Sequence, residues 1–234
     1  MLKNISRRLV FLIAVFFTAT VLAGPHKLRV TDRVLAESLV AQGGRVLADY
    51  QGFQLIEVAA LPSAKILGDH RVQVVDHFDT LQLNATTLNT RTLPTRSALL
   101  KPAAASPGSQ LVVVQFVGPI KPEWRQALVQ TGVKIVHYLP QNSYLVYGDA
   151  AALAQFQTWA AATSVVQWTG DYTGEYKVHP SARPGKSQAL SARSSGDTFS
   201  IQLVEDPLGN AATLKLIGPE RDPKLTLRLR LSKP

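Results

Sequence analysis

An internal repeat constrains the fold of this chain more than any other feature of its 234 residues. Residues 39–47 align with residues 128–136 without a gap, and each segment carries glycine between a helical pattern and a strand-like pattern. A repeat of this kind indicates a repeated supersecondary unit. We therefore expect two similar units in series rather than one continuous architecture over residues 27–178.

The second repeat has the clearer pattern of elements. Its predicted elements are a buried strand at 111–117, a helix from Pro122 that ends at Gly132, strands at 133–138 and 143–147, a helix over 150–161 with Asp149 as its N-cap, and a strand at 165–168. Proline suits the first turn of a helix, where its missing N–H is not needed, and glycine suits the C-terminal end. The order β-α-β-β-α-β is that of the ferredoxin-like fold.

The first repeat is expected to have the same order. Its predicted elements are a strand at 27–30, a helix capped by Thr31 and ended by Gly43-Gly44, strands at 45–50 and 53–58, a weak helix at 61–67 and a strand at 72–76. The predicted fold class is therefore α+β, with tandem ferredoxin-like βαββαβ units, antiparallel sheets and an incomplete third unit at the C-terminal end.

Composition divides the chain further. The predicted segments are a signal peptide at 1–23, a first unit at 24–85, a linker at 86–110, a second unit at 111–178, a linker at 179–197 and a partial third unit at 198–234. Both linkers are rich in the small, polar and proline residues that mark loops. The third unit has predicted strands at 199–204 and 225–231 around a helical stretch at 210–217, and the sequence ends too soon for a full βαββαβ unit.

The first 23 residues have the pattern of a secretion signal. Lys3, Arg7 and Arg8 precede an apolar run over 9–19, and the small-residue site at 21–23 follows it. The alternative is a membrane anchor, but a run of roughly 15 apolar residues is shorter than the ~20 needed to span a bilayer. We expect a secreted, periplasmic or cell-envelope protein with no stable membrane insertion after signal removal.

Charge and residue usage exclude several functions. The formal charge is +9, but the basic residues are dispersed except near the C-terminal end, which favours a solvated basic surface over a nucleic-acid partner. The absence of cysteine excludes disulfides and thiolate metal sites. The sequence has no G-x-S-x-G and no H-E-x-x-H. Gly185-Lys186-Ser187 resembles the end of a P-loop, but Pro180 stands where that motif requires glycine.

Two further groups of residues are candidate sites. Asp76, His77 and Asp79 place two carboxylates beside one imidazole, a set that can hold a metal, but on the predicted strand Asp76 and His77 would point to opposite faces. The aromatic residues Trp124, Phe156, Trp159 and Trp168 fall on predicted inward faces, where core packing explains them better than a ligand site. We predict no catalytic residues, no cofactor-binding residues and no metal ligands, and no cofactor.

The stretch from Leu111 to His179 resembles the N-terminal pro-region of bacterial subtilisin-like serine peptidases, in the group whose prodomain is fervidolysin-like. The resemblance rests on LVVVQFVGPI, KPEWRQAL, TGVKIVHYLPQNSYLVYG and VVQWTGDYTGEYKVHP. Its most specific features are Trp124, the turn at 140–142 and the run 178–180, and it covers about 70 residues well. The first and third units fit the same layout more loosely.

The resemblance implies a role as folding chaperone and temporary inhibitor. Such pro-regions are ferredoxin-like units whose sheet packs on the catalytic domain and whose tail lies along the substrate cleft. The implied partner is a subtilisin-like peptidase domain, in cis or in trans, which would meet the exposed face of a four-stranded sheet and the segment after Val178. The family's catalytic segments are absent, so we expect a non-catalytic, truncated or free-standing chain.

Two other functions remain open at this point. The chain could be an exported cell-envelope module that binds proteins or has a structural role, with no link to a peptidase. An independent enzyme is the third possibility, and the motifs give it little support.

Overall fold

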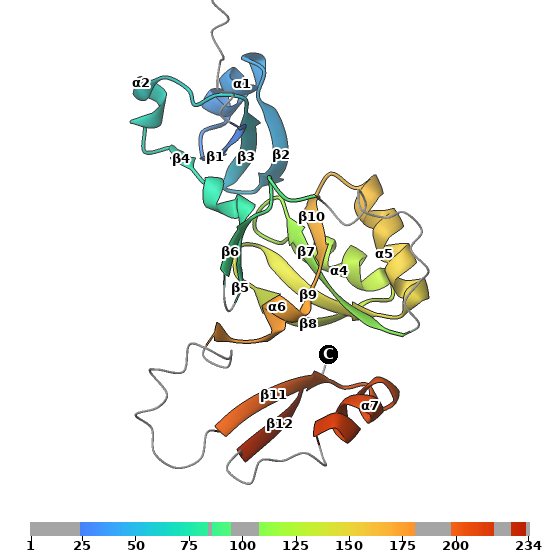
Figure 1. Cartoon of the computed structure of the whole chain (residues 1–234). Helices are drawn as coiled ribbons and strands as arrows, with labels where there is room; N and C mark the ends of the chain where they lie inside the picture. Colours follow the sequence, from blue (N-terminus) through green and yellow to red (C-terminus); the bar gives the residue numbers. More distant parts are fainter. Residues whose placement is uncertain (1–23, 84–85, 95–107, 181–197, 218–225, 233–234) are drawn as a thin grey trace, which may run out of the picture.

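The structure, a computed structural model, describes residues 24–83, 86–94, 108–180, 198–217 and 226–232. Two four-stranded antiparallel sheets, each with packed helices, make up most of it (Figure 1). The predicted signal peptide and most of the predicted linker at 179–197 lie outside the described residues. No helix in the described ranges is both long enough and apolar enough to cross a membrane.

Unit 1 has the predicted ferredoxin-like order. Its elements are β1 (His26–Val30), α1 (Arg33–Ala41), β2 (Arg45–Tyr50), β3 (Phe53–Val58), α2 (Ala64–Leu67) and β4 (Val72–Val74). The strands are ordered β2-β3-β1-β4 and every pairing is antiparallel. The apolar alternation of these strands and of α1 places one cluster between sheet and helices, made of Leu28, Val30, Ala36, Leu39, Ile56, Val58 and Val72.

Some local predictions for unit 1 were wrong. Asp32, not Thr31, caps α1, since its carboxylate accepts a hydrogen bond from the Leu35 amide at 2.8 Å. An aspartate one residue before the helix satisfies the free amide of the first turn, as an N-cap must. The predicted strand at 72–76 stops at Val74, and a 3-10 helix, η1 (Asp76–Asp79), follows it.

Unit 2 repeats the same plan. Its elements are β7 (Gln110–Phe116), α4 (Pro122–Gln130), β8 (Lys134–Leu139), β9 (Ser143–Gly148), α5 (Ala150–Ala162) and β10 (Val166–Asp171), followed by the short α6 (Gly174–Lys177). The order is β10-β7-β9-β8, again antiparallel throughout. Asp149 caps α5 as predicted, accepting from the Ala152 amide at 2.8 Å.

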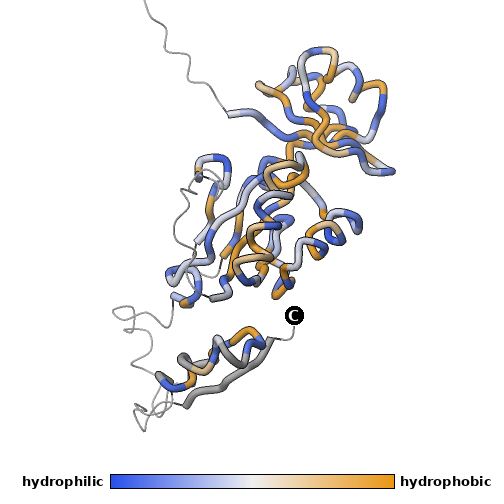
Figure 2. Tube along the Cα trace, turned by 90° about the vertical axis from the view of Figure 1, so that its right-hand side faces the viewer, coloured by the Kyte–Doolittle hydropathy of each residue, from blue (hydrophilic) through white to orange (hydrophobic). Residues whose placement is uncertain are grey.

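The backbone bears out the duplication in detail. Gly43 and Gly132 follow the first helix of their units and have φ angles of +97° and +88°, a region that glycine enters without steric cost. The next two strands pair with a bulge in both units, between Val46 and Ala48 in one and between Ile135 and His137 in the other. Matched irregularities of this kind are stronger evidence of a repeat than element order alone. In Figure 2 hydrophobic stretches gather inside the two units and hydrophilic ones lie on outer loops.

A hairpin covers the second face of the unit 2 sheet. Its strands β5 (Thr80–Leu83) and β6 (Thr86–Asn89) lie opposite α4 and α5 (Figure 1). The predicted linker at 86–110 therefore begins with a strand. Leu81 of the hairpin is fully buried in a cluster that includes Val113 and Trp168. Because β7 is covered on both faces, residues 111–114 form a continuous apolar run instead of an alternation, and the polar Gln115 that follows is buried as well.

The C-terminal part has a different strand arrangement from units 1 and 2. Strands β11 (Thr198–Val204) and β12 (Thr226–Ser232) flank α7 (Pro207–Ile217) and pair directly and in parallel. In units 1 and 2 a third strand separates the first two. The Tyr147 hydroxyl donates a 2.5 Å hydrogen bond to the Asp206 carboxylate and so connects this part to unit 2.

Candidate functional site at the junction of the two units

The loop between β7 and α4 packs on the outer face of the unit 1 sheet. A β-carbon built on Gly118 would lie 2.7 Å from Leu55 Cδ2, so the loop backbone is in direct contact with β3. The Tyr50 hydroxyl donates to the Pro119 carbonyl at 2.8 Å, and the Lys121 ammonium donates to the Asp49 carbonyl at 2.6 Å. Leu55 is fully buried as a result. The two repeats therefore share an interface.

An aromatic row forms one side of this junction. Phe53 and Tyr50 are stacked with ring centroids 4.3 Å apart, and Tyr50 meets Trp124 edge-on at 6.2 Å. The Arg29 guanidinium lies 4.5 Å from the centre of the Phe53 ring, a cation–π contact. Trp124 is buried, as predicted, but part of its environment comes from unit 1. Burial raises the pKa of Tyr50, and the negative charge of Glu123 adds to the effect.

A buried lysine forms the other side. Lys27 on β1 is only 2% exposed. Its ammonium donates to the Val117 carbonyl at 2.9 Å and to the Gln167 side-chain oxygen, and it pairs with Asp79 Oδ1 at 2.6 Å. The contacts with Val117 and Gln167 are hydrogen bonds, whereas the contact with Asp79 Oδ1 is an ion pair without hydrogen-bond geometry. Lys27 thus carries its positive charge into the interface and binds both unit 2 and η1.

Five charged side chains alternate in sign from this lysine to the surface. Asp79 lies between Lys27 and Arg91, and its second oxygen accepts from Arg91 Nε. Arg91 Nη1 lies 3.2 Å from Glu57 Oε2, and Arg45 Nη2 lies 2.8 Å from Glu57 Oε1. Unit 1 supplies Lys27, Arg45 and Glu57, η1 supplies Asp79, and Arg91 is the second residue after the hairpin. We call this set the charge chain.

The charge chain shifts the pKa values of its members in both directions. Burial lowers the pKa of Lys27, and the Asp79 carboxylate opposes that shift. Burial also disfavours the charged form of Arg91, but Asp79 and Glu57 outweigh it and raise the pKa. For Glu57, burial is outweighed by the hydrogen bonds and charges of Arg45 and Arg91, which lower the pKa. Electrostatic partners thus offset part of the desolvation cost that burial brings.

Neutral amides continue the network beneath the charges. Gln167 Nε2 donates to Gln115 Oε1 at 2.8 Å and to the Phe78 carbonyl at 3.2 Å. Gln115 is fully buried on β7 and donates to the Thr80 carbonyl at 2.8 Å. The Thr90 hydroxyl lies 2.6 Å from Gln115 Oε1. These bonds attach the hairpin to unit 2 in the same region where Lys27 attaches unit 1.

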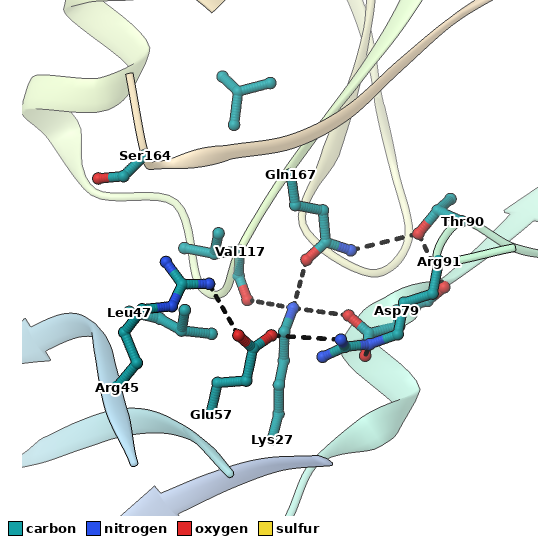
Figure 3. Close-up of a pocket in the computed structure, with 11 residues that line it drawn as sticks. Lys27, Arg45, Leu47, Glu57, Asp79, Thr90, Arg91, Val117, Ser164 and Gln167 are labelled. Atoms are coloured by element: carbon teal, nitrogen blue, oxygen red, sulfur yellow. Dashed lines mark hydrogen bonds and ion pairs between the residues drawn. The ribbon is translucent and has the colours of Figure 1, made fainter. Parts of the chain in front are cut away.

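A cavity of about 350 Å³ opens at this junction (Figure 3). Its walls combine the charge chain with Leu47, Thr90, Val117, Ser164, Val166 and Gln167. Lys27 and Asp79 are buried, whereas the Arg45 side chain is 63% exposed. The lining carries three cations and two carboxylates, which leaves one positive charge in excess. The site is therefore suited to an anion.

Asp76 and Asp79, two residues of the candidate metal motif, bind other side chains and backbone of the protein. Asp76 accepts from the Lys27 amide at 2.7 Å and lies 2.7 Å from His26 Nδ1, and Asp79 belongs to the charge chain. Their placement follows from a 3-10 turn and not from the strand on which the prediction relied. Among the described residues, no three His, Asp or Glu side chains gather as metal ligands would.

The junction was not predicted from the sequence. Lys27 and Arg29 alternate with apolar residues on β1, a pattern that ordinarily predicts a solvent-facing side. Arg45 on β2 and Glu57 on β3 are charged strand residues too, so the same pattern predicts that they face solvent. One signal was available: the continuous apolar run at residues 111–114 of β7 indicates cover on both faces of the strand, which would have pointed to a further element nearby.

Comparison with known proteins gives one partial match. Residues 76–173 match a family described as a domain of unknown function (DUF8729). The matched region begins at η1 and includes the β5–β6 hairpin, the four strands of unit 2, α4 and α5. One family model therefore covers both the hairpin and unit 2. No curated protein matches the chain. No solved structure matches it.

Proposed function

We propose that this chain is an exported, non-catalytic pro-region-like module that binds a subtilisin-like serine peptidase domain and acts as its folding chaperone and inhibitor. The observation that supports the proposal is the tandem pair of ferredoxin-like units with strand orders β2-β3-β1-β4 and β10-β7-β9-β8. The pro-regions that residues 111–179 resemble are built from such units. A docked module of this kind would lower the barrier to a native state that is under kinetic control.

The exposed face of a four-stranded sheet was the expected contact surface for the peptidase, but both candidate faces are covered. The hairpin covers one face of the unit 2 sheet, and the loop at 117–121 occupies the outer face of the unit 1 sheet. Of the sheet edges we favour β8, which pairs only with β9 in the described sheet. It presents Tyr138 with 51% of its surface exposed. An extended segment of a partner can add to such an edge through main-chain hydrogen bonds.

Peptidase inhibition is the direct test. The chain from Gly24 onward is titrated against a bacterial subtilisin-like peptidase cleaving a chromogenic peptide, and the refolding yield of the acid-denatured peptidase is measured in parallel. We expect slower cleavage and a higher yield of refolded enzyme. Equal rates and equal yields with and without a saturating excess of the chain would refute the proposal.

Matched variants test the edge of β8. Tyr138→Asp places a charge on this edge, and Val34→Asp places one on α1, where Val34 is 76% exposed. We expect Tyr138→Asp to weaken inhibition about tenfold, which corresponds to about 1.4 kcal/mol. Val34→Asp should leave inhibition unchanged. Equal inhibition by both variants, with both folded by circular dichroism, would assign the contact to another surface.

A cell-envelope module without a peptidase partner is the second candidate. The covered face of the unit 2 sheet favours it, because that face is the one by which a pro-region unit would pack on its enzyme. The coding sequence that follows the codon for Pro234 distinguishes the two. A peptidase domain there supports the first proposal, and unrelated sequence supports the second.

A further inference from the structure

The charge chain begins and ends on a cation. It starts at the buried Lys27 and runs through Asp79, Arg91 and Glu57 to Arg45. Each carboxylate lies between two cations, so both carboxylates are matched. Arg45, at the exposed end, has its guanidinium in contact with Glu57 through Nη2. One more anion beside Arg45 would extend the alternation and neutralise the lining.

The cavity beside Arg45 has an apolar wall as well as a charged one. Leu47, Val117 and Val166 line it, and Ser164 supplies a hydroxyl-bearing side chain. In Figure 3 Arg45 and Ser164 lie on one side of the view, and Asp79, Thr90 and Arg91 lie on the other. A volume of about 350 Å³ falls at the lower end of the range for small-molecule sites. A hydrated inorganic ion would leave the apolar wall without contacts.

We propose that this cavity binds a single carboxylate that carries a short apolar stem, with Arg45 as its ion-pair partner. A guanidinium can hold a carboxylate with two parallel hydrogen bonds. The stem lies against Leu47, Val117 and Val166, which adds hydrophobic contact. The carboxylate comes either from a free organic acid or from an acidic side chain of a protein partner. The inference is independent of the proposed peptidase partner.

Butyrate is the probe for the free acid. The chain from Gly24 onward is titrated with sodium butyrate at constant ionic strength, with sodium chloride as compensation, and the Arg Nε–Hε signals are followed by NMR. We expect a saturable shift of the Arg45 signal, weaker binding of acetate, and little effect of inorganic phosphate. No saturable shift at about 100 mM butyrate, or phosphate binding at least as tight as butyrate, would overturn the proposal.

Variants separate the site from general charge effects. Arg45→Gln should weaken butyrate binding at least tenfold. Arg33→Gln removes an equally basic side chain that is 76% exposed and does not line the cavity, and it should leave binding unchanged. Ser164→Asp keeps the charge chain intact and adds a carboxylate to the cavity wall, so it should also weaken butyrate binding. Equal binding by all three variants would refute the assignment.

A peptide pair distinguishes the source of the carboxylate. An acetylated and amidated Ala-Ala-Glu peptide is compared with its Ala-Ala-Gln counterpart. Tighter binding of the Glu peptide than of butyrate supports a protein partner, and tighter binding of butyrate supports a free organic acid. A Gln peptide that binds as well as the Glu peptide would contradict recognition of a carboxylate.

Discussion

Replacing Gly118 with alanine tests whether the two repeats are energetically coupled. The new β-carbon would lie 2.7 Å from Leu55 Cδ2 and 3.0 Å from the Tyr50 hydroxyl. Both distances are shorter than ordinary van der Waals contact. Leu55 is fully buried and cannot turn away into solvent, so the loop has to move off the unit 1 sheet. The change does not touch the cluster between the unit 1 sheet and its helices, whereas Leu55 belongs to the buried cluster that includes the unit 2 core.

The expected cost follows from overpacking. An extra methyl group in a well-packed site destabilises by about 1–3 kcal/mol. Leu55→Ala alone should cost about 2–5 kcal/mol, because it leaves a cavity. The double variant should cost less than the sum, since the smaller side chain makes room for the new methyl group. We expect a coupling of about 1–2 kcal/mol between the two positions.

Two spectroscopic signals in urea report the effect. The three tryptophans, Trp124, Trp159 and Trp168, all lie in unit 2, so their fluorescence follows that unit, while far-UV circular dichroism follows both. In the parent chain the two transitions should coincide. In Gly118→Ala the circular dichroism should show unit 1 unfolding at lower urea than unit 2.

The control is Gly52→Ala. Gly52 lies in the turn between β2 and β3, and a β-carbon there meets nothing within 4 Å. That variant should be neutral or slightly stabilising, because it restricts the unfolded chain. A cost of Gly118→Ala below about 0.5 kcal/mol, or full additivity with Leu55→Ala, would refute the packing of the loop on unit 1.

Three further predictions concern the junction. Trp124→Ala should cost about 3–5 kcal/mol by urea denaturation, and a loss near 0.5 kcal/mol would contradict its buried placement. Lys27→Met should cost about 3 kcal/mol in the same assay, because it leaves Asp79 with one cation in a buried site; a neutral result would contradict the burial of this ion pair. The folded state lowers the pKa of Glu57 below its ordinary value of 4.5. Its contribution to the free energy of unfolding is therefore complete above pH 4.5 and is lost as the pH falls through the folded-state pKa. The difference in unfolding free energy between the parent chain and Glu57→Gln should therefore shrink from pH 6 to pH 3, and a difference that grows would contradict the sign.

Much of the fold was predictable because its signals are local. The alternation of β2, β3, β8 and β9 and the glycines after the first helices gave two βαββαβ units in the correct order. Asp149 was predicted as a cap and is one. Errors came where two local signals compete. Thr31 and Asp32 both suit an N-cap, and only the helix start decides between them.

The predicted linker at 86–110 shows a different limit. Its threonines and prolines are typical of loops, yet Thr86–Asn89 forms a strand and Thr90 is buried. A short polar strand becomes stable when it pairs with β5 and covers apolar side chains such as Val113. That stabilisation comes from a sheet more than 20 positions away in sequence, and composition within the segment does not record it.

The sequence alone determined the repeat, the fold class and the order of strands and helices, since hydrophobic period and turn chemistry act over a few residues. Only the tertiary structure decided how the units join. The loop at 117–121 brings a buried environment to Lys27 and Leu55, which on β1 and β3 alone would face water. Whether a charged side chain on a strand is solvated or buried depends on what packs over that face, and residues about 90 positions apart in the sequence settle it here.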